Sequence, residues 1–352
     1  MRQARMIRPD RRGYRSWRGV GMKRVCAGLF LLLTLGFCAS AQATNSCTAS
    51  SSGVAFGTIS PIANIATSAS GSITVTCTWD AATLLRYVLV CANLGTGDSS
   101  SSAAPRSLAN GSNLLSYNLY TDSAYSAIWG STSNTSATTP LSMTLSSTLA
   151  LVSTSSSATA TIYGRVPAGQ TTVPTVSNSS TVYSESFSGA YTRLDYQFYE
   201  LIVPTCASMA AQTVRFPFVV NATVINNCNI TTTPLSFGST TLLNSAVTSS
   251  TSISVQCTNG DAYEVALDGG TTSGTVASRQ MVGASSGGKV SYQLYLDSAH
   301  ATPWGDGTNS TSMAAGTGSG SAQALTVYGR VPVQSVPTPD SYSDTVKATV
   351  YF

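Results

Sequence analysis

Residues 72–79 read SITVTCTW, and apolar and polar side chains alternate through the whole stretch. The threonines would point to one side, and the other side would carry Ile73, Val75, Cys77 and Trp79. Alternation with a period of two is typical of a β-strand that buries one face. Residues 252–258 read SISVQCT and repeat the pattern 180 positions later (252 − 72 = 180). The recurrence predicts that a strand-rich unit occurs twice.

That unit is long, and both copies contain the same motifs. Residues 116–130 (SYNLYTDSAYSAIWG) match residues 291–305 (SYQLYLDSAHATPWG), which lie 175 positions later (291 − 116 = 175). The run TIYGRVP at 161–167 likewise matches TVYGRVP at 326–332. A long unit that occurs only twice indicates tandem domains rather than a solenoid. Short strands separated by turn residues predict an all-β fold of two tandem immunoglobulin-like β-sandwich domains, residues 44–222 and 223–352.

Residues 1–43 have the features of an export signal. Lys23 and Arg24 precede an apolar run over residues 25–37, and residues 41–43 (AQA) resemble a cleavage site. Met22 would open a signal peptide of ordinary length and is therefore an alternative start. The apolar run is too short for a transmembrane span. We expect residues 1–43 to be removed and the rest of the chain to be exported.

The charge of the chain changes when this leader is set aside. Nine of the 18 basic residues lie in residues 1–43 with one acid, Asp10. The remainder has 18 − 9 = 9 basic and 14 − 1 = 13 acidic residues, a net charge of −4. The arginine-rich start could alternatively be a nucleic-acid-binding arm. The basic residues after the leader are few and scattered, however, and do not support this alternative. We expect no nucleic-acid partner.

Cysteine spacing predicts the disulfides. Eight cysteines less Cys26 and Cys38 of the leader leave six, which allow 15 pairings. Two pairs have nearly equal spacing (77 − 47 = 30 and 257 − 228 = 29) and bracket the same motifs in the two copies. Two cysteines then remain, and they have no counterpart in the second copy. The predicted disulfides are Cys47–Cys77, Cys228–Cys257 and Cys91–Cys206.

Residues that could support catalysis are scarce. His300 is the only histidine, and Tyr125 takes its place in the first copy. A catalytic triad or a histidine metal site therefore cannot be part of the repeated design. No CxxC pair is present either. We expect no enzymatic activity, no cofactor and no metal, and we expect His300 to pack beside Trp304 at a turn.

The two copies end differently. The first continues past Phe187 into residues 214–224, where apolar side chains alternate again, and Pro217 suggests an edge strand. The second reaches Phe352 without such a segment, which predicts a sandwich that lacks its final strand and has an open groove. The groove candidates are Val346, Ala348, Val350 and Phe352. The alternative is that residues 191–203 and 214–224 only decorate the first domain and that the second closes unaided.

The YGRVP motif and the closing run SYSDTVKATVYF at 341–352 resemble the spore coat protein U domain family. The cysteine, Phe-Gly and VTC or VQC pattern of each N-terminal half fits this family too, so the resemblance covers residues 47–187 and 228–352. Two such domains in one exported chain resemble the tip adhesin of an archaic, Csu-type chaperone–usher pilus. The resemblance implies donor-strand complementation of the second domain by a periplasmic chaperone and then by the next pilin subunit.

The same resemblance implies passage through an outer-membrane usher to the pilus tip at the cell surface, with attachment and biofilm formation as the role. Cys47 lies three residues beyond Thr44, the predicted mature start (47 − 44 = 3), which is too short for a donor strand. We therefore expect a subunit that accepts a strand and gives none.

Apolar loop residues of the first domain are the candidates for contact with a hydrophobic or host surface. They are Ile128, Leu149, Leu151, Val152, Val173 and Val176. The alternative for Leu149 and Leu151 is membership of a strand. Two other function classes stay open. One is a structural coat protein of a spore or cell, and the other is a carbohydrate-binding module that stacks sugars on Tyr125, Trp129 or Tyr196.

Overall fold

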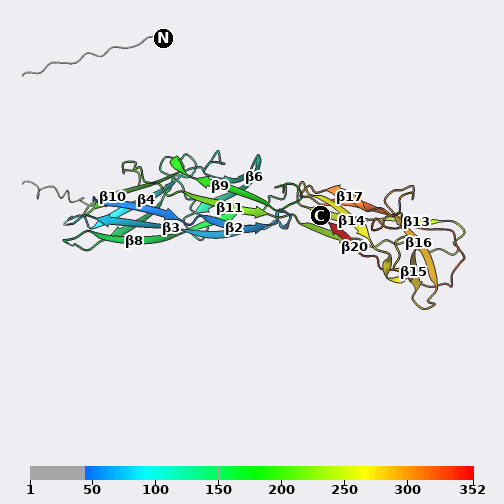
Figure 1. Ribbon diagram of the computed structural model, residues 1–352. Coiled ribbons are helices and arrows are strands. Elements are labelled where there is room, and N and C mark those ends of the chain that lie inside the picture. Colours follow the sequence, from blue (N-terminus) through cyan, green and yellow to red (C-terminus); the bar gives the residue numbers. More distant parts are fainter. Residues whose placement is uncertain (1–43, 82, 150) are drawn as a thin grey trace, which may run out of the picture. The chain divides into compact units, whose positions relative to one another are not determined.

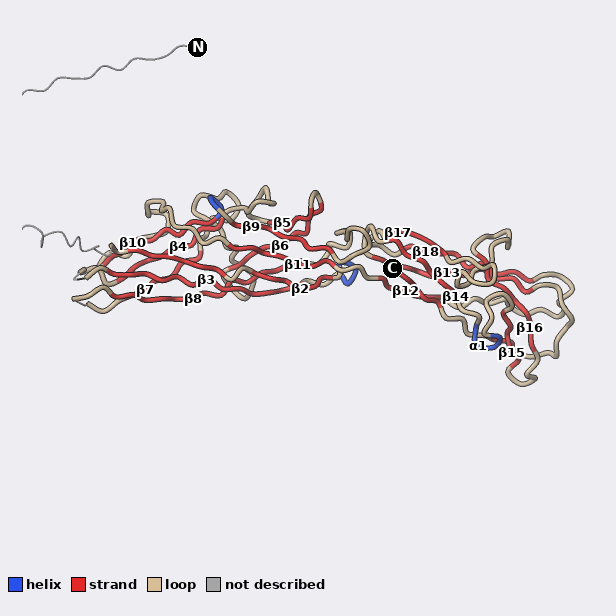
Figure 2. The backbone as a smooth tube through the Cα atoms, in the orientation of Figure 1, coloured by secondary structure: helices blue, strands red, loops and turns tan. Residues whose placement is uncertain are grey.

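The computed structural model describes residues 44–81, 83–149 and 151–352, so the predicted export signal over residues 1–43 lies outside the described residues. The fold is all-β, and its sheets fall into two domains (Figures 1 and 2). Short helical turns occur at Pro61–Ala63, Gly189–Tyr191 and α1 (Gly270–Ser273). In the described part of the chain, no helix has both the length and the hydropathy that a membrane crossing requires.

The first domain is a sandwich of two sheets. An eight-stranded sheet has the order β1-β3-β8-β6-β5-β9-β11-β2, and a three-stranded sheet has the order β10-β4-β7. The strands are β1 (Ser46–Ser51), β2 (Val54–Ile59), β3 (Thr67–Trp79), β4 (Tyr87–Leu94), β5 (Arg106–Asn110), β6 (Asn113–Tyr120), β7 (Leu141–Ser146), β8 (Thr154–Val166), β9 (Thr181–Phe187), β10 (Thr192–Tyr199) and β11 (Phe218–Val224).

The second domain repeats this plan with fewer strands. A six-stranded sheet has the order β12-β13-β18-β16-β15-β19, and a three-stranded sheet has the order β17-β14-β20. The strands are β12 (Cys228–Thr232), β13 (Val247–Cys257), β14 (Ala262–Leu267), β15 (Arg279–Gly283), β16 (Lys289–Tyr295), β17 (Ala314–Thr317), β18 (Gln323–Val331), β19 (Tyr342–Ser343) and β20 (Ala348–Tyr351).

The predicted strand alternation is present in β3. Its apolar residues Ile73, Val75 and Cys77 are 0% exposed, and Trp79 is 1% exposed, while the threonines between them face outward. The counterpart strand β13 buries its own alternate residues in the second core. Burial of one face holds the register, because a slip by one residue would turn every apolar side chain outward.

Three disulfides join the cysteines that the spacing pairs. Cys47–Cys77 and Cys228–Cys257 each link residues that already face one another on neighbouring strands, β1 with β3 and β12 with β13. The third, Cys91–Cys206, joins β4 to the long connection between β10 and β11. Only this one fastens a loop.

Strand β11 corrects one expectation from the sequence. Pro217 suggested an edge strand, but β11 starts one residue later and pairs on both sides, antiparallel to β9 and parallel to β2. Pro217 is tolerated because it precedes the ladder, so its missing N–H removes no ladder bond. The inward residues of β11 are 7% exposed or less, which excludes mere decoration of the first domain; they are Phe218, Val220, Ala222 and Val224.

The end of β11 also bears on the division of the chain. The sequence suggested a boundary after Ala222, which would cut off the last two residues of this strand, Thr223 and Val224. Strand β12 begins at Cys228. We propose a boundary within residues 225–227, because it keeps both strands whole.

Candidate functional site

One sheet edge of the second domain is open. Strand β19 pairs with β15, and it ends the six-stranded sheet. Its counterpart in the first domain is β9, as the matching runs Tyr-Ser-Glu at 183–185 and Tyr-Ser-Asp at 342–344 indicate. Strand β9 is covered on the corresponding edge by β11. Within residues 228–352, no described strand takes that place.

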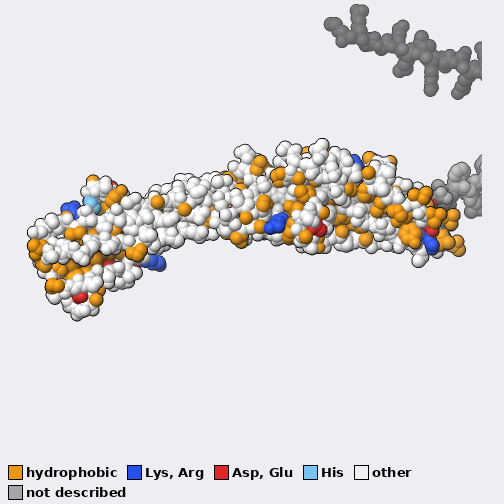
Figure 3. All heavy atoms as spheres, turned by 180° about the vertical axis from the view of Figure 1, so that it is seen from behind, with side chains coloured by type: hydrophobic (Ala, Val, Ile, Leu, Met, Phe, Trp, Pro, Cys, Tyr) orange, Lys and Arg blue, Asp and Glu red, His pale blue; other side chains and the backbone are white. Residues whose placement is uncertain are grey.

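A groove of about 1100 Å³ occupies the uncovered position. In Figure 3 it is the hollow, rich in hydrophobic side chains, at the left of the view. Its apolar lining comes from both sheets and from the segment before β13, and includes Leu235, Phe237, Leu243, Met281, Leu294, Val327, Val331, Val346 and Ala348. An apolar groove beside an unpaired strand edge is the arrangement into which an extended peptide can add itself.

The first domain provides a measure of what the groove lacks. Val54 and Phe56 belong to β2, which pairs with β11 in the same sheet, and they are 2% and 6% exposed. Their counterparts in the second copy, Leu235 and Phe237, form no strand and are only half-buried. The same motif therefore forms a strand only where a neighbouring strand pairs with it.

The predicted groove residues divide into two pairs. Val346 and Ala348 line the groove. Val350 and Phe352 do not, so their assignment was wrong. Strand β20 leaves the open edge and pairs with β14 of the other sheet, where Val350 lies opposite Val265 and packs on the core. Phe352 follows that strand and is 48% exposed.

A polar network includes Tyr292 and Asp344, which line the groove, and Arg279, which does not. The hydroxyl of Tyr292 donates to Asp344 at 2.8 Å, and the buried guanidinium of Arg279 donates to the backbone carbonyl of Asp268 at 2.7 Å. Burial raises the pKa of Tyr292, and its hydrogen bond to Asp344 raises it further.

The first domain contains the corresponding network, in which Glu185 of β9 lies opposite Val220 of β11. Tyr117 donates to Glu185, and Arg106 donates to the carbonyl of Gly95 at 2.8 Å. The side chains of Arg106, Tyr117 and Glu185 are each 1% exposed or less. Burial raises the pKa of Glu185 to about 7. Sequence reasoning did not single out this network, although the repeated Tyr-Ser-acid run was a signal for it.

A second feature lies at one end of the first domain. Tyr199 at the end of β10, Tyr87 at the start of β4 and Ser146 at the end of β7 stand side by side in the ladder. Trp79 and Thr154 are paired in the same way where β3 ends and β8 begins. The connections over residues 80–86, 147–153 and 200–217 therefore leave the sandwich at the same end.

These connections carry exposed apolar side chains, which we call the apolar loop cluster. Leu151, Leu201 and Ile202 are 91%, 90% and 85% exposed. Figure 3 shows hydrophobic side chains gathered at this end, at the right of the view. The other exposed members are Leu84, Leu85, Leu149, Val152 and Val203. A concentration of this kind on a folded domain marks a surface for binding.

Polar contacts tie the loops to one another. Arg86 donates its backbone N–H to the carboxylate of Glu200 at 3.0 Å, and its guanidinium lies 3.4 Å from the same group. Ser147 donates its backbone N–H to the carbonyl of Arg86 at 2.9 Å. Arg86 and Glu200 form the only ion pair among the described residues at this end. Their charges cancel, so the cluster carries little net charge.

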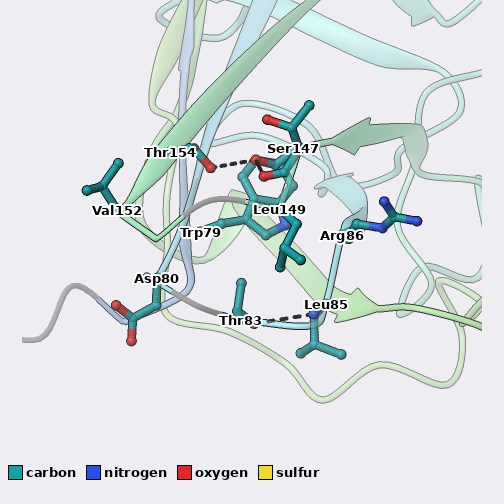
Figure 4. A pocket seen from close by; sticks show the side chains of 10 residues that line it. Trp79, Asp80, Thr83, Leu85, Arg86, Ser147, Leu149, Val152 and Thr154 are labelled. Carbon is teal, nitrogen blue, oxygen red and sulfur yellow. Dashed lines mark hydrogen bonds between the residues drawn. The ribbon is translucent and has the colours of Figure 1, made fainter.

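Trp79 forms the base of a small pocket in the cluster (Figure 4). Leu149 lines the same pocket, and the hydroxyls of Ser147 and Thr154 are hydrogen-bonded at 2.5 Å. The Nε1 atom of Trp79 is buried and has no hydrogen-bond partner among the described residues. Its ring packs edge-on against Phe198, with 5.4 Å between centroids.

The structure separates the predicted contact residues. Leu149, Leu151 and Val152 lie in the connection between β7 and β8 rather than in a strand. Val173 is 6% exposed and belongs to the first core, so it cannot contact a surface and its assignment was wrong. Val176 is exposed but follows the far end of β8.

Ile128 is half-buried and bridges to Tyr120, away from the loop ends. Leu84, Leu85 and residues 201–203 were not among the contact residues predicted from the sequence. The run Leu-Ile-Val at 201–203 reads as a continuation of the strand before it, and only its exposure separates it from a core segment.

The stacking platforms suggested for sugars are mostly occupied. Trp129 is 0% exposed, and its Nε1 donates to the carbonyl of Ala92 at 2.8 Å, so it offers no face to a ligand. Tyr125 has the guanidinium of Arg165 over its ring at 5.0 Å. Tyr196 packs edge-on against Phe198.

His300 lies at a turn with φ of 57°, as Tyr125 does in the first copy. It packs edge-on against Tyr295 at 5.2 Å, and not beside Trp304 as expected. Over residues 44–352 as described, no group of three or more His, Cys, Asp or Glu side chains could hold a metal ion.

Comparison with known proteins gives one family and several solved structures. The family model of the Spore Coat Protein U domain matches residues 33–183 and 214–349. No curated protein sequence gives a significant match. A solved structure with 18% identity and a TM-score of 0.47 is the CsuC–CsuE chaperone–tip adhesion subunit pre-assembly complex from archaic chaperone–usher Csu pili of Acinetobacter baumannii; the match covers 87% of this chain and 100% of that chain.

Two further structures are more distant. The CupB6 tip adhesin of Pseudomonas aeruginosa has 11% identity and a TM-score of 0.37, and the match covers 87% of this chain and 94% of that one. CfaE, the adhesive subunit of CFA/I fimbria of enterotoxigenic Escherichia coli, has 11% identity and a TM-score of 0.28, with 74% and 81% covered. Likenesses at these scores carry no argument about function.

Proposed function

The chain belongs to the Spore Coat Protein U domain family, and from this premise we propose that it is a non-enzymatic tip adhesin of a chaperone–usher pilus. It is exported through the periplasm to the cell surface and mediates attachment and biofilm formation. Its second domain is completed by a strand from a partner, and its first domain carries the adhesive end.

The observation that carries the proposal is the vacant strand position in the second domain. In the first domain β11 fills the corresponding position with four inward side chains that are 7% exposed or less. Burial of each of the three larger ones, Phe218, Val220 and Val224, contributes about 1.5–3 kcal/mol. A strand that enters the groove of about 1100 Å³ would bury the apolar walls in the same way.

The first domain also predicts how the guest strand would run. Strand β11 is antiparallel to β9 and parallel to β2. A guest strand would accordingly run antiparallel to β19 and parallel to residues 234–237. A periplasmic chaperone would supply the first guest strand, the next pilin subunit would replace it at the outer-membrane usher, and main-chain hydrogen bonds to the open edge would hold it.

The apolar loop cluster is the proposed adhesive surface. Its exposed leucine, isoleucine and valine side chains come from three connections at one end of the first domain. They offer apolar area and almost no net charge, which suits a hydrophobic surface better than a charged one.

The groove can be tested by giving the chain its own guest strand. The mature chain is extended after Phe352 by a flexible linker and a copy of residues 216–224 (FPFVVNATV). The expected result is a rise of roughly 10 °C or more in the melting temperature of the second domain, since the added burial amounts to several kcal/mol.

The matched control carries asparagine at the four inward positions of the added copy and should leave the melting temperature unchanged. Equal melting temperatures for both extended chains and the unextended chain would contradict the proposal.

The position of this subunit in the pilus is tested separately, by labelling it on assembled fibres. Label along the whole shaft instead of at the ends would exclude a tip adhesin.

A further inference from the structure

We infer that the Cys91–Cys206 disulfide is a positioning device, which holds residues 201–203 of the apolar loop cluster in the arrangement that contacts a surface. The inference rests on the proposed adhesive role of the cluster. It concerns the one disulfide that has no counterpart in the second copy of the repeat.

The loop that Cys206 fastens has few other supports. Residues 200–217 connect β10 to β11 and form no strand or helix. At its start, Glu200 pairs with Arg86. Its next hydrogen bond to the sandwich beyond Cys206 comes from the backbone N–H of Gln212, which donates to Asp195 at 2.9 Å. The exposed residues 201–203 lie between the first of these supports and the disulfide.

The support at the start of the loop is weak by itself. The side chains of Arg86 and Glu200 are 50% and 34% exposed, and ion pairs this open to water contribute little to stability. Packing against the core does not hold this segment either, because the side chains of Leu201, Ile202 and Val203 are 90%, 85% and 63% exposed. Without the disulfide, the span between fixed points would grow from 206 − 200 = 6 to 212 − 200 = 12 residues.

The other end of the disulfide is rigid. Cys91 is 0% exposed in the middle of β4, where it is paired with Asp195 of β10 and with Ser142 of β7. The loop is therefore fastened to the centre of a sheet and not to another loop. A loop held in its bound arrangement loses less conformational entropy on binding, so fixing it raises affinity without adding any contact.

The first domain contains a matched control for removal of a disulfide. Cys47–Cys77 joins two residues that already face one another across β1 and β3, so its removal frees no loop. The second domain has the same arrangement in Cys228–Cys257. Loss of either type of disulfide lowers stability, but only loss of Cys91–Cys206 should loosen residues 201–211.

The experiment compares the C91S/C206S and C47S/C77S variants of the full chain, displayed on pili, at a temperature where both are folded. In C91S/C206S, amide hydrogen exchange at Thr205 and Ser208, whose N–H groups are hydrogen-bonded within the loop, should become about tenfold faster or more, because the freed loop opens locally. Attachment to a hydrocarbon surface should fall about fivefold, because the loop must be ordered again on binding. C47S/C77S should leave both readouts near those of the parent chain.

Two more variants keep the outcomes distinct. Insertion of Gly-Gly between Val203 and Pro204 loosens the loop with the disulfide intact, so it decides the matter if C91S/C206S does not fold. The L201S/I202S/V203S variant tests whether the loop takes part in adhesion at all. Unchanged attachment in that variant would overturn the adhesive role of this loop, and the inference with it.

If L201S/I202S/V203S loses attachment while C91S/C206S or the Gly-Gly insertion keeps it, the adhesive surface stands and the positioning role of the disulfide is refuted. Loss of attachment in all three, with the C47S/C77S control unaffected, supports the positioning role. Equal loss in both disulfide variants would mean that general destabilisation, and not the loop, is responsible.

Discussion

The three fully buried tryptophans differ in how their indole N–H groups are satisfied. Trp129 and Trp304 occupy equivalent places in the two copies, and each donates to a backbone carbonyl at 2.8 Å, that of Ala92 and that of Val265. Trp79 has no such partner among the described residues. A buried polar group without a hydrogen bond costs free energy, so the same residue type contributes differently at the two sites of the first domain.

Replacing each tryptophan of the first core by phenylalanine should reveal this difference. In Trp129→Phe the carbonyl of Ala92 loses its donor, which costs about 1–3 kcal/mol beyond the lost packing, whereas Trp79→Phe leaves no group newly unpaired. We therefore expect Trp79→Phe to lower the free energy of unfolding by less. Urea denaturation of the two variants measures it, and an equal or larger loss in Trp79→Phe would contradict the expectation.

The buried carboxyl group of Glu185 makes the first domain sensitive to pH. Burial raises the pKa of this group from 4.5 to about 7, so the folded state favours the protonated form. Its contribution to stability is then fully present below pH 4.5 and is lost as the pH rises through about 7. A shift of this size corresponds to about 3 kcal/mol.

The Glu185→Gln variant should remove this dependence, because its neutral amide can still accept the hydrogen bond from Tyr117. We expect the free energy of unfolding of the first domain to fall between pH 5 and pH 8 in the parent chain, and to change much less in the variant. Denaturant titrations at several pH values measure this. Parallel pH profiles would show that Glu185 is not the group responsible.

At the scale of the element, β11 in the first domain and the open groove in the second occupy equivalent positions. The strand belongs to the eight-stranded sheet only because both β9 and β2 pair with it. Where it is missing, the copy of β2 forms no strand and the copy of β9 is reduced to the two residues of β19. One strand therefore organises two neighbours, and its loss exposes the core between the sheets.

Neighbouring residues of β11 offer a direct comparison. Val220 is 0% exposed and faces inward beside Glu185, whereas Val219 faces outward and is 47% exposed. Val220→Asp should lower the free energy of unfolding of the first domain by more than about 3 kcal/mol, because it buries a second carboxylate, while Val219→Asp should change it by about 0.5 kcal/mol or less. Thermal unfolding of both variants tests this, and similar melting temperatures would count against the inward placement.

At the scale of the whole molecule, charge is sparse and apolar surface is concentrated. Beyond residue 43 the chain has 9 basic and 13 acidic residues, and the described apolar loops contain one ion pair, Arg86 with Glu200. A surface of this composition should bind through the hydrophobic effect. Salt should therefore leave binding intact, because ions screen only charged interactions.

The L149S/L151S/V152S variant should attach to a hydrophobic surface several-fold less well, since about 1.5–3 kcal/mol is available for each apolar side chain buried. Fibre number per cell should stay the same. Leu114→Ser is the control, because Leu114 is 51% exposed on the first domain but lies in the β5–β6 hairpin. Attachment that survives in L149S/L151S/V152S would remove this loop from the adhesive surface, and attachment abolished by moderate salt would refute an apolar mechanism.

Local patterns in the sequence were enough to predict strands, repeats and disulfide partners. The alternation in residues 72–79 predicts β3 and its buried face, because side chains of a strand alternate whatever its partners are. Alignment of the two copies also predicted an open sheet edge, and no strand within residues 228–352 pairs on the free edge of β19. Each of these inferences depends on residues that are close in sequence or can be aligned between the copies.

The composition of the groove and of the apolar loop cluster depends on pairing between distant strands. Val350 alternates like a groove residue, but β20 pairs with β14 and carries it to the other sheet. Leu84, Leu151 and Leu201 share one end of the first domain only because the ladders align the ends of β4, β7 and β10. A period of two determines which side chains share a face, and it contains no information about the strand that lies beside them, so only the tertiary structure decides which faces meet.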